Sequence, residues 1–157
     1  MQERVAVRDE QGNAKYYAEG VFAVAKNYRI YTPDGRELAS VRQKKVSSTG
    51  TCIIERDGSE VARVIPKITL VKPKYAVEPW GWIIEGNFKQ SDFVIKQNGE
   101  EIVHVKLRLF TEGNGYEIDI EDGADEVNAL ACVLIIEGLL ETQILNTAMM
   151  TSFPAGR

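Results

Sequence analysis

The only histidine, His104, is the first residue to consider as a general base. It lies between Val103 and Val105 in a segment where apolar and polar residues alternate, which puts its side chain on the face opposite those valines. No nucleophile stands beside it, and the sequence contains no glycine-rich phosphate loop, no Ser/His/Asp order and no Cys/His pair. We therefore predict a surface or structural histidine and no catalytic residue.

Acidic residues crowd the segment from position 119 to 126, and clusters of carboxylate oxygens can hold Ca²⁺. The candidate calcium ligands are Asp119, Glu121, Asp122 and Asp125. Their spacing does not fit an EF-hand loop, because Gly123 falls at loop position five if Asp119 is position one. A structural alternative remains open, in which the first two carboxylates face outward from a strand, the third lies in a turn and Asp125 caps a helix.

Basic residues gather in two neighbouring parts of the chain. The candidate ligands for an anionic lipid headgroup are Arg42, Lys44, Lys45, Lys67, Lys72 and Lys74. On an acidic protein, such local density could form a concave anion site. The alternative is a solvated face whose lysines also protect strand edges from pairing with other chains.

The overall composition excludes several classes of function. The net charge of −4 argues against a general nucleic-acid binder. The N-terminal segment has no apolar stretch of a secretory signal, and no apolar run reaches the ~18–20 residues of a membrane span. The two cysteines, Cys52 and Cys132, fit neither a disulfide framework nor a metal motif. We predict a cytoplasmic protein, peripheral at the membrane if it binds lipid, with no cofactor.

The elements that would position these residues are hairpins. Glycines at positions 12, 35, 58, 81, 99 and 123 recur at intervals of 18 to 24 residues, each between short segments of alternating apolar residues. Asp34-Gly35, Asp57-Gly58, Asn98-Gly99 and Asp122-Gly123 are the strongest of these signals, since glycine accepts the positive φ that tight hairpin turns require. We expect the first three to form two-residue hairpin turns or close relatives of them. The pattern predicts a hairpin repeated about five times.

The last element is a helix from Asp125 to Glu141. From Val127 to Leu140 only Asn128, Glu137 and Gly138 interrupt an apolar run, so the helix is apolar on nearly all sides and must be surrounded by protein. Because a sheet of about ten or more strands tends to close, we predict a mainly β fold: a closed antiparallel β-barrel, built from the hairpin repeats and wrapped around this helix. The chain, 1–157, is expected to be one domain with a core at about 15–141 and a tail at 142–157.

Several ordered motifs resemble one known family. The segments are Thr69–Tyr75, Gly86–Phe88 after Trp82, and Tyr116–Asp125 leading into the apolar helix. Together with the hairpin order they are similar to the LURP-one-related family of the tubby C-terminal-like superfamily, to which phospholipid scramblases are also assigned. The resemblance covers roughly residues 15–141, and it implies a closed twelve-stranded barrel around a central C-terminal helix.

The resemblance also shapes the functional hypotheses. The family carries no general catalytic motif, and some tubby proteins bind phosphoinositide headgroups, although their binding residues cannot be matched here one by one. We predict a non-enzymatic binding module that recognises an anionic phospholipid or a protein partner. The alternatives are a scramblase-like calcium-dependent membrane protein, since scramblases carry an acidic calcium segment before their apolar helix, and an enzyme with an unrecognised site.

Overall fold

The computed structural model describes residues 2–22, 26–43, 50–67, 72–110, 113–140 and 148–152. Its elements are β1 (Gln2–Arg8), β2 (Ala14–Phe22), β3 (Lys26–Tyr31), β4 (Glu37–Gln43), β5 (Cys52–Arg56), β6 (Ser59–Lys67), β7 (Lys74–Glu78), β8 (Trp82–Asn87), the 3₁₀ turn η1 (Phe88–Gln90), β9 (Asp92–Gln97), β10 (Glu100–Phe110), β11 (Gly113–Ile120), α1 (Glu126–Leu140) and β12 (Ala148–Ser152).

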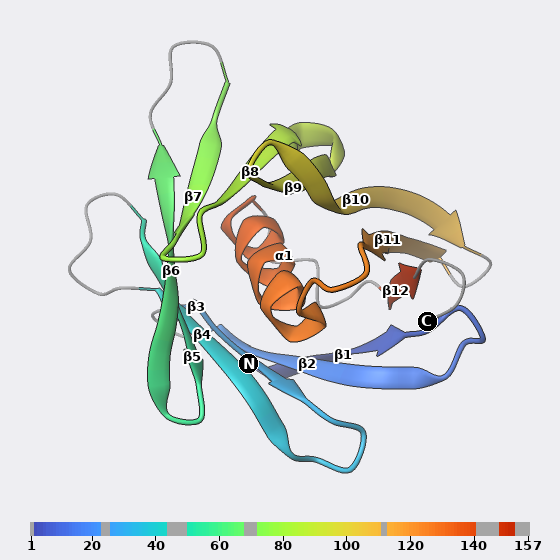
Figure 1. The fold of residues 1–157 in the computed structure, drawn as a ribbon. Helices are drawn as coiled ribbons and strands as arrows, with labels where there is room; N and C mark the ends of the chain where they lie inside the picture. Colours follow the sequence, from blue (N-terminus) through green and yellow to red (C-terminus); the bar gives the residue numbers. More distant parts are fainter. Residues whose placement is uncertain are drawn as a thin grey trace.

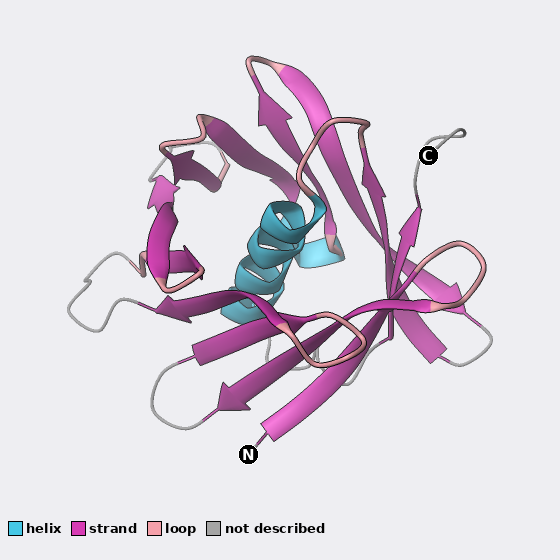
Figure 2. Ribbon diagram, turned by 60° about the horizontal axis from the view of Figure 1, so that its bottom comes forward, coloured by secondary structure: helices cyan, strands magenta, loops and turns pink. Residues whose placement is uncertain are grey.

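The strands β1 to β11 form one antiparallel sheet in which each strand pairs with the next along the chain. Figure 1 shows this sheet curving around α1, and a second view shows the helix lying along its inner side (Figure 2). The mainly β architecture with one C-terminal helix packed on the sheet is therefore confirmed. Both β1 and β12 lie outside the predicted core of 15–141.

Two of the predicted hairpin turns have the expected backbone. Asp57 and Gly58 join β5 to β6 with φ of 52° and 77°, and Asn98 and Gly99 join β9 to β10 with φ of 52° and 80°. Positive φ at both central residues is the mark of the type I′ turn, whose twist suits paired strands. Gly35 also has a positive φ, of 95°, within the longer connection between β3 and β4.

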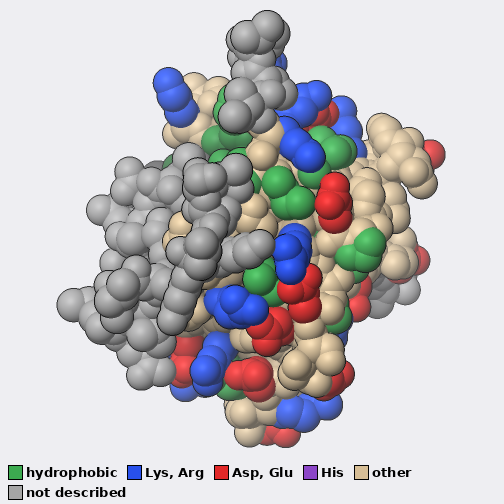
Figure 3. Space-filling model, turned by 90° about the vertical axis from the view of Figure 1, so that its left-hand side faces the viewer, with side chains coloured by type: hydrophobic (Ala, Val, Ile, Leu, Met, Phe, Trp, Pro, Cys, Tyr) green, Lys and Arg blue, Asp and Glu red, His purple; other side chains and the backbone are tan. Residues whose placement is uncertain are grey.

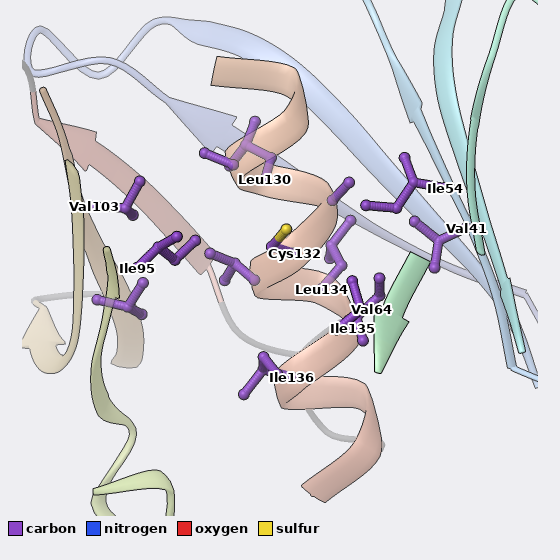
Figure 4. Packing of buried hydrophobic residues seen from close by; sticks show 14 of the residues in the cluster. Val41, Ile54, Val64, Ile95, Val103, Leu130, Cys132, Leu134, Ile135 and Ile136 are labelled. Carbon is purple, nitrogen blue, oxygen red and sulfur yellow. The ribbon is translucent and has the colours of Figure 1, made fainter. Parts of the chain in front are cut away.

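Helix α1 is buried on every side between Ala129 and Ile136. The eight consecutive side chains from Ala129 to Ile136 are each 1% exposed or less. Because successive residues are rotated by about 100° around a helix, eight in a row cover its whole circumference. In Figure 4, Val41, Ile54 and Val64 approach the helix from one side of the sheet, and Ile95 and Val103 approach it from the other.

Candidate functional site

Three of the predicted lipid-binding lysines lie together at the end of the β6–β7 hairpin. Lys67, the last residue of β6, is directly opposite Lys74, the first residue of β7, and Lys72 comes just before β7. All three are exposed. Residues directly opposite in an antiparallel pair have Cβ atoms about 5 Å apart, so the two strand lysines repel each other. Lys44 and Lys45 lie outside the described residues.

Arg42 does not join this cluster. It lies on β4, separated from β6 by β5, and its Nε donates a hydrogen bond of 2.7 Å to Oε1 of Glu55. The predicted set is thus divided between two parts of the outer surface. The residues Lys67, Lys72 and Lys74 form what we call the lysine cluster.

A hollow of about 750 Å³ adjoins the lysine cluster on β7, β8 and β9. It is lined by Lys72, Lys74, Glu85, Gly86, Asn87, Gln90, Asp92, Phe93 and Val94. A volume of this size is in the usual range of about 300–1,000 Å³ for small-ligand sites. The absence of a side chain at Gly86, directly opposite Phe93, leaves backbone exposed to the hollow.

The charges around the hollow favour an anion. The Glu85 carboxylate accepts hydrogen bonds from two lysine ammonium groups. Its Oε1 lies 2.7 Å from Nζ of Lys96, and its Oε2 lies 3.2 Å from Nζ of Lys74. The hydrogen bonds from Lys96 and Lys74 lower the pKa of the Glu85 carboxyl, which therefore stays ionised at neutral pH. The lining itself has two lysines and two carboxylates, Glu85 and Asp92, but Lys67 opposite Lys74 and Lys96 on Glu85 bring the lysines to four, so positive charge is locally in excess.

This excess is local. Figure 3 shows the side of the molecule on the left in Figure 1, where basic side chains are interleaved with acidic and hydrophobic ones. Interleaved charges of opposite sign largely cancel at distances beyond the Debye length of about 8 Å. An anion would therefore be attracted to the lysine cluster itself and not to a broad basic face.

The acidic segment before α1 supports the helix. Oδ1 of Asp125 accepts a hydrogen bond of 3.0 Å from the Asn128 backbone N–H, which is an N-cap, and Oδ2 of Asp125 lies 3.0 Å from Nη1 of Arg56. Asp119 faces His104 across the β10–β11 pair. Among the described residues, no three His, Cys, Asp or Glu side chains come together to hold a metal ion. Direct contacts thus support the structural role of Asp125 as a helix cap, while calcium binding stays a prediction.

The comparisons with known proteins identify a family. The family model described as LURP-one-related matches residues 1–137. The chain belongs to the LURP-one-related family. It is 25% identical over 134 residues to the "Uncharacterized protein YxjI" of Bacillus subtilis (strain 168), an alignment that covers 85% of this chain and 82% of that protein. No solved structure matches the chain.

His104 of this LURP-one-related chain faces away from the core, as predicted. Val103 and Val105 are buried, whereas the His104 ring lies with its Nε2 2.8 Å from Oδ1 of Asp92 and its Nδ1 3.7 Å from Oε1 of Glu101. A histidine held between carboxylates on a sheet surface has a structural explanation, and none of these contacts brings a nucleophile to it.

Sequence reasoning about this LURP-one-related chain missed Glu85, which lines the hollow, and Lys96, which forms an ion pair with Glu85. Alternation does place both on the outer face, since their neighbours Ile84 and Ile95 are buried. Their meeting depends on the register of β8 against β9, where Glu85 is opposite Val94 and Ile83 is opposite Lys96. That register joins separate segments and has no local sequence signal. In the described part of the chain, no helix has the length and apolar character needed to cross a bilayer.

Proposed function

We propose that this protein is a non-enzymatic binding module of one domain that binds an anionic phospholipid headgroup at the lysine cluster and its adjoining hollow. The observation that carries the proposal is the direct opposition of Lys67 and Lys74, with Lys72 beside them on the rim of the hollow. Like charges opposite each other destabilise a strand pair. A bound phosphate would offset that repulsion and accept charge-assisted hydrogen bonds from the lysine ammonium groups.

Vesicle sedimentation tests the lipid proposal. We expect the protein to sediment with vesicles containing phosphatidylserine or phosphoinositide, and not with vesicles of phosphatidylcholine alone, with binding that weakens as salt is raised. Each lysine contributes about 1 kcal/mol near an anionic surface. The double variant Lys67→Gln/Lys72→Gln should therefore bind about 30-fold more weakly.

The matched control is Arg36→Gln/Lys106→Gln, which changes the net charge equally at the β3–β4 connection and on β10. The control should bind like the wild type if the lysine cluster is the site. Equal loss in both variants would mean that only total charge matters, and no sedimentation at low salt would remove the lipid proposal and leave a protein partner as the better reading.

We also propose that β12 closes the sheet into a twelve-stranded barrel around α1. Support comes from Met149, which is paired in parallel register with Val7 of β1 and with Tyr116 of β11 (Figure 1). Such closure would satisfy the backbone groups along the outer edges of β1 and β11.

Cysteine crosslinking tests the closure. Arg8 and Met150 are paired between β1 and β12, and paired strand residues have Cα atoms about 5 Å apart, which suits a disulfide. We expect Arg8→Cys/Met150→Cys to crosslink within the chain on mild oxidation, detected by mass spectrometry. The control Arg8→Cys/Arg36→Cys should remain reduced, because these two positions are on different hairpins. Equal crosslinking of the two pairs would count against closure.

A further inference from the structure

A second hollow, of about 530 Å³, lies on the outer face of β2 to β5, and we call it the outer groove. It is lined by Glu19, Asn27, Tyr28, Arg29, Tyr31, Ser40, Val41, Arg42 and Glu55. Tyr28 and Val41 are paired and their side chains belong to the core, so they contribute to the floor. The groove is separate from the lysine cluster, and nothing in the proposed lipid binding requires it.

The outer groove exists because a small residue is surrounded by long ones. Glu19, Arg29, Ser40 and Glu55 are directly paired in one row across β2, β3, β4 and β5. Outward side chains in such a row lie side by side on the same face. The short Ser40 side chain therefore forms a depression between the long side chains of Arg29 and Glu55.

Two guanidinium groups flank this depression, and each is held by a carboxylate. Arg42 uses its Nε to bind Glu55, and its two Nη groups make no hydrogen bond with the described part of the chain. Arg29 has its Nε 3.7 Å from Oε1 of Glu37. A hydrogen bond with Tyr31 and the nearby Glu37 charge raise the pKa of Arg29, so its positive charge is permanent at physiological pH.

The charge balance of the outer groove selects the ligand. Its lining contains two arginines, Arg29 and Arg42, and two glutamates, Glu19 and Glu55, and thus has no net charge. A phosphate dianion would be repelled by the glutamates as strongly as it is attracted by the arginines. A molecule with one carboxylate and one ammonium group matches both signs, because a guanidinium fork fits a carboxylate and a glutamate accepts an ammonium.

We infer that the outer groove binds a small zwitterion with a free α-carboxylate and α-ammonium group, that is, a free amino acid or a short peptide. The carboxylate binds at the Nη groups of Arg42 above Ser40, and the ammonium group binds toward Glu19. Asn27 and Tyr31 add an amide and a phenol that can hydrogen bond the ligand backbone.

Amide chemical shifts of the ¹⁵N-labelled protein test this inference, with L-alanine and L-alanyl-L-alanine as probes. We expect saturable shifts centred on Ser40 and Arg42 for at least one probe below about 10 mM. Tighter binding of L-alanine would identify free amino acids as the class, and tighter binding of the dipeptide would identify short peptides. N-acetyl-L-alanine and L-alanine amide, which each lack one charge, should bind at least about 10-fold more weakly than L-alanine.

Two variants locate the binding. Ser40→Val fills the depression on an exposed sheet face, where a β-branched residue is well tolerated, and should weaken binding at least about 10-fold. Ser59→Val, at the start of β6 and outside the groove, is the matched control and should bind like the wild type. Arg42→Lys keeps the charge but loses the fork, and should also weaken binding.

Three results would each overturn the inference. The first is the absence of saturable shifts with both probes. The second is unchanged binding in Ser40→Val when its thermal unfolding shows that the variant is folded. The third is inorganic phosphate binding as tightly as the better zwitterion, since this would show an attraction for anions in general.

Discussion

Leu134→Asp is expected to abolish folding. Leu134 is 1% exposed and lies in the middle of the eight-residue stretch of α1 that is buried on every side. The substitution removes a packed side chain, at about 2–5 kcal/mol, and adds a carboxyl group that must be buried without a partner, at several more. Since whole domains are stable by only about 5–15 kcal/mol, most of the stability is lost.

Circular dichroism and thermal unfolding measure this effect. We expect the variant to be insoluble, or soluble without a cooperative unfolding transition. The control is Leu134→Met, which nearly conserves volume and should cost less than about 1.5 kcal/mol. If Leu134→Asp melted within a few degrees of the wild type, α1 would have an open side and the burial described above would be wrong.

The sequence predicted those parts of the fold that depend on local signals. Asn98-Gly99 predicts a tight turn because the required positive φ is a property of the two residues themselves. The run from Ala129 to Ile136 predicts all-round burial because no polar face is available to meet water. The family resemblance, which also rests on short motifs in the sequence, predicted the fold as well. The matched family model confirms that the chain belongs to this family.

The sequence could not predict which charged side chains meet across strands. The register shifts at four places, between Val7 and Arg8, Ile30 and Tyr31, Ile54 and Glu55, and Glu101 and Val103. Each such irregularity changes which side chains are opposite each other, and its position is set by packing between segments. Even without an irregularity, pairing between segments decides such contacts: β4 and β5 place Ser40 opposite Glu55, so that Arg42, two residues along the same face, reaches Glu55, whereas its place in the sequence groups it with the lysines.

The hollow that adjoins the lysine cluster depends on Gly86, whose close approach to β9 also has no local sequence signal. Gly86 has a φ of 146°, which side chains of L-residues rarely accept, and it faces Phe93 across the β8–β9 pair. A Cβ atom at Gly86 would lie 2.6 Å from Cα of Phe93 and 2.7 Å from the backbone oxygen of Asp92. Both contacts are far shorter than van der Waals distances, and both are with backbone atoms that cannot rotate away.

We therefore expect Gly86→Ala to destabilise the protein by about 3 kcal/mol or more, from backbone strain of about 1–3 kcal/mol and an overpacking cost of similar size. In a chain of this length that corresponds to a fall in the melting temperature of roughly 6–12 °C. The matched control is Gly99→Ala. Its φ of 80° is also positive, but a Cβ there would meet no atom within 4 Å, so only strain of about 1 kcal/mol applies. Equal losses in the two variants would mean that strain alone acts, and that β8 and β9 do not approach as closely at Gly86 as the structure has them.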